Sequence, residues 1–307
     1  AAGYYGNNST DPDAVTTGQG FVVSERNGRW GQAIEVPGLG ALNKGGGGQQ
    51  GTGVNSVSCA APGNCAADGS YYSDTAGHQQ AFVVSQENGT WGTAQEVAGN
   101  LNTGASAFAD TVSCGSAGNC SAGGAYTDRS HNGQAFVVSE VNGTWAAARE
   151  VAGRLNTNGA ASVFSVSCPA AGSCAADGDY DYDYNWGFLV GEKNGAWGTA
   201  INVPGVAALA FRYTDVISVS CAAAGSCAAG GDYETPGGSQ GFVASQHNGD
   251  WGKAITVPGL GALNNKDGNA EVSSVSCPAA GTCVAGGDYQ ATGGSDFQAF
   301  VTQEVRA

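Results

Sequence analysis

The sequence has no methionine and few basic residues. Lysine and arginine together number 11, against 26 aspartates and glutamates, so the formal net charge of the 307 residues is −15. Affinity for nucleic acid depends on clustered lysine and arginine, and the basic residues here do not cluster. No apolar run reaches the length of about 18 residues that a membrane-spanning helix needs. The composition therefore excludes nucleic acid as a partner and predicts no insertion into a membrane.

Cysteine and glycine, by contrast, are abundant. The 52 glycines follow no collagen period and indicate many turns, hence many short strands. Ten cysteines form C-x5-C pairs, namely Cys59–Cys65, Cys114–Cys120, Cys168–Cys174, Cys221–Cys227 and Cys277–Cys283. Cysteines that flank a short hairpin loop lie opposite each other on paired strands, within disulfide reach. A zinc site would favour a C-x2-4-C spacing and further ligands, so the pairs predict five structural disulfides.

The cysteines also predict a location. Disulfides form in oxidising compartments such as the cell exterior. The chain starts Ala1-Ala2-Gly3, which suits a mature end left by signal-peptide cleavage. We expect a secreted, extracellular protein.

Two landmarks repeat along the chain. The first cysteines of successive pairs are 55, 54, 53 and 56 residues apart. An Asn-Gly-x-Trp motif alternates with them, at Asn27–Trp30, Asn88–Trp91, Asn142–Trp145, Asn194–Trp197 and Asn248–Trp251. Because the two series interleave, one unit carries both. We predict a single domain, residues 1–307, of six units at about 1–53, 54–108, 109–162, 163–215, 216–271 and 272–307.

Each unit predicts four short strands. Examples in order are Ser165–Cys168, Cys227–Tyr233, Gln134–Glu140 and Thr90–Val97. Asn-Gly closes a tight hairpin between the third and fourth strands, since both turn residues need positive φ. Four antiparallel strands per unit are the pattern of a propeller blade, whereas a solenoid would not need them. We predict an all-β propeller with six blades, the first without its inner strand and the last without its outer strand. A five-bladed ring with a displaced terminal hairpin is the alternative.

The hairpin run, as in SQENGTW at Ser85–Trp91, resembles the Asp box of sialidase-type propellers, although one residue is missing and asparagine stands at the turn. The resemblance implies a propeller with structural hairpins on its outer rim and confers no activity. Sialidases also need three arginines on the substrate carboxylate. Only Arg129, Arg154 and Arg212 lie in loops that could share a face, so sialidase activity is not expected. The whole repeat resembles secreted actinobacterial repeat proteins, which implies no particular function.

Tyrosine and asparagine recur at one end of the units. A tyrosine ends every second strand, at Tyr5, Tyr71, Tyr126, Tyr180, Tyr233 and Tyr289. A Leu-Asn pair recurs in four of the five long loops, with Asn43, Asn102, Asn156 and Asn264. An aromatic face can stack on a pyranose and an amide can bond vicinal hydroxyls, so these residues predict repeated sugar sites on one face. Alternatively, the tyrosines pack between blades and the asparagines pin the loops.

The fourth unit departs from the repeat. Asp177, Asp179, Asp181 and Asp183 alternate with other residues shortly before Trp186. Several carboxylate oxygens suit Ca²⁺, which would use Asp179, Asp181 and Asp183, and the aromatic residues suit a sugar platform. The EF-hand pattern is not met, and alternating aspartates on a strand also point together toward solvent. No other cofactor is predicted.

Acidic residues near the inner strands give an enzyme hypothesis. Asp215 and Glu271 each lie six residues before the first cysteine of their unit, and Asp110 lies four before its own. The loop before Asp215 adds Arg212 and Tyr213. Paired carboxylates about 5–10 Å apart can act as acid and base on a glycosidic bond. Alternatively, they are solvated loop acids.

Near-identical repeats favour binding over catalysis, because a catalytic site usually needs one asymmetric constellation. We therefore predict a lectin-like protein that binds an extracellular glycan or polysaccharide at several similar sites on one face. The alternatives are a glycan-cleaving enzyme, either a glycoside hydrolase or a polysaccharide lyase, and a protein-interaction scaffold.

Overall fold

The computed structural model describes residues 1–6, 18–44, 52–73, 78–157, 159–181, 185–291 and 296–304. This part of the chain is all-β, with helical turns only at α1 (Leu39–Leu42), η1 (Val206–Ala208) and α2 (Leu260–Leu263). None of these helices is long and apolar enough to cross a membrane. The chain divides into two compact units, Ala1–Glu150 and Val151–Ala307, and each is described by itself.

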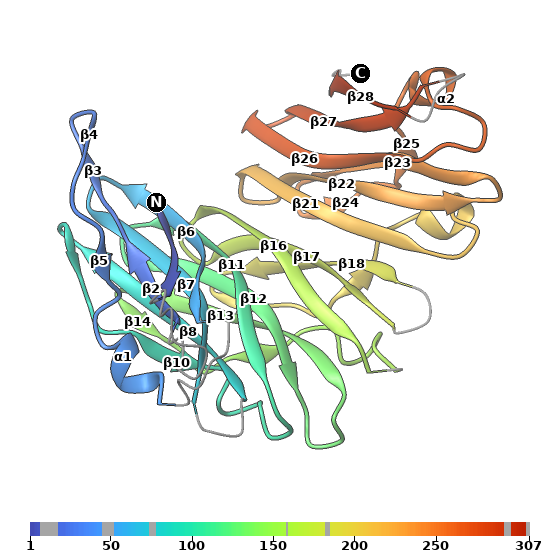
Figure 1. The fold of residues 1–307 in the computed structure, drawn as a ribbon. Coiled ribbons are helices and arrows are strands. Elements are labelled where there is room, and N and C mark those ends of the chain that lie inside the picture. The colour runs from blue at the N-terminus through green and yellow to red at the C-terminus, as the bar shows by residue number, and fades with distance from the viewer. Residues whose placement is uncertain are drawn as a thin grey trace. The chain divides into compact units, whose positions relative to one another are not determined.

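The N-terminal unit contains three main antiparallel sheets (Figure 1). The first comprises β1 (Ala2–Gly6), β2 (Gly18–Val22) and β5 (Ile34–Glu35). The second comprises β6 (Gly53–Ala61), β7 (Asn64–Tyr72), β8 (Gln79–Glu87) and β10 (Gln95–Val97). The third comprises β11 (Ala107–Ser116), β12 (Asn119–Thr127), β13 (Gly133–Val141) and β15 (Arg149–Glu150). Short strands build the outer hairpins, namely β3 (Glu25–Arg26), β4 (Arg29–Trp30), β9 (Thr90–Trp91) and β14 (Thr144–Trp145).

The C-terminal unit repeats this arrangement. One group of strands is β16 (Ala161–Ala170), β17 (Ser173–Tyr180), β18 (Trp186–Lys193) and β20 (Ile201–Asn202). The next is β21 (Thr214–Ala223), β22 (Ser226–Thr235), β23 (Gly238–His247) and β25 (Ile255–Thr256), and the last is β26 (Ala270–Ala279), β27 (Thr282–Gln290) and β28 (Phe297–Gln303). The outer hairpins use β19 (Ala196–Trp197) and β24 (Asp250–Trp251). A parallel bridge between Trp186 and Thr214 joins the first two groups.

This strand order confirms the prediction of repeated four-stranded antiparallel sheets, in which strands adjacent in sequence pair as in a propeller blade. Among the described residues, the first sheet has no inner strand and the last has no outer strand, as expected from the sequence. The core is built from the third strands, where Phe82, Phe136, Phe188 and Phe242 are completely buried. The number of blades in a closed ring stays a prediction.

All five predicted disulfides are present. The Cα atoms of each cysteine pair are 3.9 to 4.1 Å apart. In three hairpins the two cysteines are direct partners across the strands, as the spacing requires. Each disulfide therefore closes the hairpin between an inner strand and a second strand.

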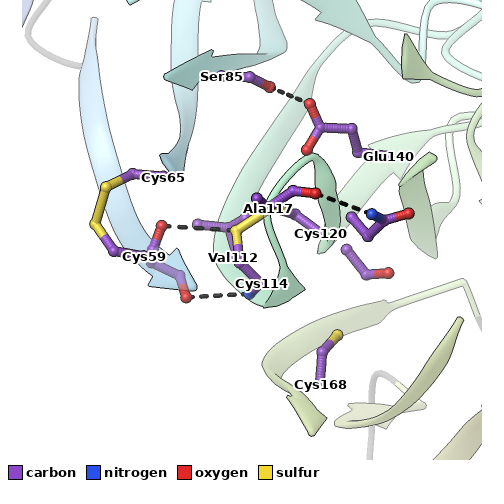
Figure 2. The surroundings of a disulfide bond; sticks show 12 residues. Cys59, Cys65, Ser85, Val112, Cys114, Ala117, Cys120, Glu140 and Cys168 are labelled. Carbon is purple, nitrogen blue, oxygen red and sulfur yellow. Dashed lines mark hydrogen bonds between the residues drawn. A yellow bond between two sulfur atoms is a disulfide. The ribbon is translucent and has the colours of Figure 1, made fainter. Parts of the chain in front are cut away.

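The two serines before the first cysteine of a unit join neighbouring sheets. Ser56 Oγ accepts a hydrogen bond from the backbone N–H of Val112 (3.3 Å). Ser58 Oγ accepts one from Cys114 (3.1 Å), which lies beside the Cys59–Cys65 disulfide in Figure 2. The C-terminal unit has the same pairs at Ser165–Val219, Ser167–Cys221, Ser218–Val275 and Ser220–Cys277. The alternating serines of the inner strand thus serve packing between sheets.

The Asn-Gly hairpins contact the cystine hairpins of their own sheets. The five turn asparagines have φ between 49° and 54°, as a tight hairpin requires. The Gly89 N–H donates to the Gly63 carbonyl (2.8 Å), and a Cβ at Gly63 would lie 2.8 Å from the Gly89 nitrogen. Glycine is needed at position 63 because any side chain would push the two hairpins apart.

In the third sheet, the hairpin tryptophan has a structural role. The Trp145 indole N–H donates to Ser85 Oγ (2.9 Å) of the preceding sheet. The Ser85 hydroxyl in turn donates to Glu140, and Figure 2 shows these two side chains pointing toward each other. Trp145 is buried by this contact. The motif therefore fastens one sheet to the next.

Candidate active site

Acidic side chains gather where the second strands end and the inner strands begin. These two places are adjacent because the strands are antiparallel. Asp215 of β21 is the direct cross-strand partner of Asp232 of β22, and Glu271 of β26 is that of Asp288 of β27. Like charges directly opposite each other destabilise a sheet. Destabilising pairs of this kind are expected mainly where function requires them, so the two acidic pairs indicate a candidate functional site.

The carboxyl groups of the C-terminal unit influence one another. Burial, followed by the charges of Asp215 and Glu271, raises the pKa of Asp232 to about 7. Burial and the charge of Asp215 raise the pKa of Asp179 to about 7. The pKa of Asp215 is also raised by burial and by Glu271, while a hydrogen bond from Asn185 opposes the rise. We call Asp179, Asp215, Asp232 and Glu271 the acidic cluster.

Neutral donors, and no cations, surround the acidic cluster. The Tyr213 hydroxyl donates to Asp232 Oδ2 (3.3 Å), and Ser239 also hydrogen-bonds this carboxyl. Asp215 Oδ1 is buried without a hydrogen-bond partner. In the part of the chain that the structure describes, no lysine, arginine or histidine forms an ion pair with the cluster. Within this part of the chain, therefore, no neighbouring cation lowers the raised pKa values of Asp179, Asp215 and Asp232.

This arrangement suits proton transfer. A carboxyl with a pKa near 7 is partly protonated at neutral pH, so one member of the cluster can donate a proton while a neighbour accepts one. Burial, followed by the charge of Asp232, raises the pKa of Tyr213 to about 12, which keeps its hydroxyl a hydrogen-bond donor. Two carboxyl groups in these roles are what hydrolysis of a glycosidic bond requires.

The structure thus places three of the predicted catalytic residues, Asp215, Glu271 and Tyr213, in one region. Arg212 lies instead over the Phe211 ring, with 5.1 Å between Cζ and the ring centroid. Asp110 belongs to the N-terminal unit. Asp232 was not predicted, although its place in the Gly-Gly-Asp-Tyr segment opposite Asp215 was a usable signal.

A separate cavity of about 350 Å³ lies at the end of β17. Tyr180 and Trp186 are direct cross-strand partners and line it together with Asn202 and residues 203–207. The Tyr180 hydroxyl donates to Asn202 Oδ1 (2.7 Å). Successive side chains of a strand point to opposite faces, so Asp179 and Tyr180 lie on opposite faces of the sheet. The cavity is therefore distinct from the acidic cluster.

The N-terminal unit has an acidic pair of its own. Asp68 is completely buried, with the backbone of Ser56 beside its carboxyl. Burial, followed by the charge of Asp110, raises its pKa, and burial raises the pKa of Asp110 to about 6. Sequence reasoning missed Asp68, although three other repeats have glycine there, at Gly123, Gly230 and Gly286.

The tyrosines predicted to bind sugar are largely inside the sheets. Tyr71, Tyr126 and Tyr233 are 1%, 3% and 5% exposed. Their hydroxyls bond side chains of the fourth strands, at Glu96, Glu150 and Thr256. A buried ring cannot stack on a sugar, so at these three positions the structure supports the alternative of a packing role. Tyr180 and Tyr289 remain partly exposed.

The predicted asparagines hold loops. Asn43 donates to the Gly18 carbonyl (3.0 Å), and Asn264 donates to the Ser239 carbonyl (3.1 Å). Asn156 accepts from the backbone N–H of Gly159 (3.0 Å). Asn102 pairs with the side-chain amide of Gln80. These contacts again support the alternative, in which the Leu-Asn pair pins the loop.

The structure describes two of the three predicted calcium ligands, Asp179 and Asp181. Asp179 belongs to the acidic cluster, and Asp181 follows it with φ 83°. Asp183 lies outside the described residues. Within the described ranges, no three aspartate, glutamate, histidine or cysteine side chains are placed to hold a metal ion. Calcium binding stays a prediction.

No protein-family model and no curated protein sequence matches the chain. Among solved structures, a protein of unknown function from Dyadobacter fermentans is 11% identical with a TM-score of 0.50, over 98% of this chain and 87% of that one. The Hadza microbial sialidase Hz136 is 11% identical with a TM-score of 0.49, over 97% of this chain and 62% of the sialidase. An α-L-arabinanase of Penicillium chrysogenum is 12% identical with a TM-score of 0.40, over 98% and 88%. The similarity to the Dyadobacter protein concerns the fold alone, and we draw no conclusion about activity from the two enzymes.

Proposed function

We propose that the protein is a glycoside hydrolase whose catalytic residues lie in the acidic cluster of the C-terminal unit. The observation that supports this most directly is the placement of Asp215 opposite Asp232, two carboxyls with raised pKa values and, among the described residues, no cation paired with them. We do not propose the lectin with several similar sites, because three of the tyrosines predicted to bind sugar are buried.

The surroundings assign different roles to the two carboxyls. Asp232, with a pKa of about 7, retains a proton in much of the population at neutral pH and is the general acid. Asp215 accepts a hydrogen bond from Asn185, which favours its charged form, and is the base or nucleophile. Glu271 acts as a positioning residue because its charge helps to raise the pKa values of both carboxyls. Asp179 is a further acid of the cluster, and the charge of Asp215 helps to raise its own pKa.

The substrate class follows from charge. A protein of net charge −15 with an acidic site repels anionic polymers, so we propose a neutral glycan. Five disulfides support a location outside the cell, where such polymers are accessible.

The test is release of reducing ends from a panel of neutral polysaccharides. We expect activity in the native protein and a loss of about 100-fold or more in Asp215→Asn and Asp232→Asn, as for removal of a general acid or base. Asp250→Asn, in an exposed outer hairpin, is the matched control and keeps full activity. Unsaturated products would indicate a lyase, and equal activity in all three variants would refute the assignment.

A second candidate is carbohydrate binding at the cavity of Tyr180 and Trp186. Two partly exposed aromatic side chains on one face, beside the Asn202 amide, suit a pyranose. Titration calorimetry with the same oligosaccharides would give one site per chain, abolished by Trp186→Ala. A stoichiometry of several equal sites would argue against this cavity as the binding site.

A further inference from the structure

The first two sheets do not pack against each other through two inner strands, as the other neighbouring sheets of each unit do. We call the packing of one sheet against the next a junction. Inner strands of consecutive sheets pack against each other at β6–β11, β16–β21 and β21–β26. The first described sheet starts with β1, which is a second strand, so β6 has no preceding inner strand beside it. It contacts β1 and β2 instead. Within the described residues of the N-terminal unit, one face of β6 therefore has no inner strand against it.

This face of β6 includes two backbone donors. The N–H groups of Val57 and Cys59 occupy the repeat positions of Val112 and Cys114, whose N–H groups donate to serine hydroxyls of the preceding inner strand. No such acceptor for Val57 or Cys59 exists among the described residues. Val57 is 37% exposed, whereas its counterparts Val112, Val219 and Val275 are 6%, 5% and 7% exposed.

A cavity of about 910 Å³ covers this face. Its lining includes Val57, Cys59, Ser24, Trp30 and Trp91. The Trp91 indole N–H is buried without a partner, although the equivalent N–H of Trp145 donates to Ser85. Trp30 is 62% exposed. The cavity thus combines an apolar floor with donors that have no acceptor.

We propose that this cavity is a docking site for an extended polypeptide strand with serine at alternate positions, the pattern of the chain's own inner strands. The three complete junctions show what such a segment does: its hydroxyls accept from alternate N–H groups of the next inner strand, and the valine that carries the first of these N–H groups is buried. Among the described strands of the N-terminal unit β1 pairs with β2 alone, so its other edge can accept the segment and extend the sheet. The proposal does not depend on the enzymatic function.

The test uses a synthetic peptide with the sequence of residues 162–167, Ser-Val-Phe-Ser-Val-Ser, and the intact protein. On binding, the amide signals of Val57 and Cys59 should shift in nuclear magnetic resonance spectra, and their hydrogen exchange should slow tenfold or more. A peptide with alanine in place of Ser165 and Ser167 loses two hydrogen bonds and should bind about tenfold more weakly. Equal binding of the two peptides would overturn the proposal.

A variant pair locates the site. Val57→Lys should abolish peptide binding, whereas Val141→Lys, at a 52% exposed valine in an outer hairpin, should leave it unchanged. Circular dichroism and retention of all disulfides check that both variants fold, and the comparison of peptides needs no variant. Self-association of the protein that competes with the peptide would assign the cavity to a second copy instead and overturn the proposal as stated.

Discussion

Asp68 in the N-terminal unit and Asp177 in the C-terminal unit occupy the same repeat position, three residues after the second cysteine. Both are completely buried, and each carboxyl has a serine backbone beside it, that of Ser56 at Asp68 and that of Ser165 at Asp177. They differ in one neighbour. Beside Asp68, the bulge of the next inner strand holds Asp110, whereas the corresponding bulge of β21 holds Ile217. A neighbouring charge therefore adds to the raised pKa of Asp68, while burial alone raises that of Asp177.

A raised pKa by itself thus does not identify an active site. The pKa of Asp177 is raised because its side chain is completely buried, where no substrate can reach it. Asp215 and Asp232 have raised pKa values as direct cross-strand partners, beside the neutral donor Tyr213. The placement of two carboxyls opposite each other, rather than the size of the pKa shift, distinguishes the acidic cluster from Asp177.

The largest expected effect tests which unit carries the chemistry. Asp215→Asn should lower kcat/KM by about 100-fold or more, because it removes a reacting carboxyl. Asp110→Asn in the N-terminal unit should change kcat/KM by less than about twofold by the same argument. Assays on a cleaved polysaccharide check both. A large loss in Asp110→Asn alone would reverse the proposed difference between the units.

The second prediction concerns stability and pH. The folded-state pKa of Asp177 is raised, so its contribution to stability is fully present below the unfolded pKa of about 4 and is lost as pH rises through the folded pKa. Asp177→Asn removes this dependence. Its free energy of unfolding at pH 8 should exceed that of the native protein by about 1–3 kcal/mol, and the difference should shrink toward pH 4.

Urea unfolding at several pH values measures this difference, with Asp250→Asn as the control. A gain that does not change with pH would show that ionisation of Asp177 is not its cause.

A smaller effect compares equivalent tyrosines of the two units. The buried Tyr126 hydroxyl donates to the Glu150 carboxylate (2.6 Å), so Tyr126→Phe should destabilise the protein by about 1–2 kcal/mol. Tyr180 is partly exposed and donates to a neutral amide, so Tyr180→Phe should cost less than about 1 kcal/mol. Thermal or urea unfolding measures which variant loses more stability. Equal losses of unfolding free energy would mean that the difference in burial between the two tyrosines has no effect.

The smallest effect is a change in one titration. Asp110→Asn removes the neighbouring charge and should lower the pKa of Asp68 without changing that of Asp177. Carbon-13 nuclear magnetic resonance of the aspartate carboxyls measures both. Parallel movement of the two values would indicate a general structural change.

Local patterns were enough to predict the repeat, the strands and the disulfides, because hairpins bring residues of similar number together. The acidic cluster was only partly predicted. Asp215 and Glu271 stood out by their distance from the cysteines, but the place of Asp232 depends on strand register. The buried tyrosines were open to two interpretations, since a position at a strand end does not reveal what covers it. The role of the inner-strand serines depends on hydrogen bonds between neighbouring sheets, which join residues 54 to 57 positions apart in the sequence.

The serine bonds between sheets have a consequence for unfolding. Each complete inner strand is fastened mainly to its immediate neighbours, so the stability of a repeat is a nearest-neighbour property, as in a one-dimensional array. The first described sheet has no inner strand and so none of these serine bonds, and amide exchange in the N-terminal unit should begin there and progress into the next sheet.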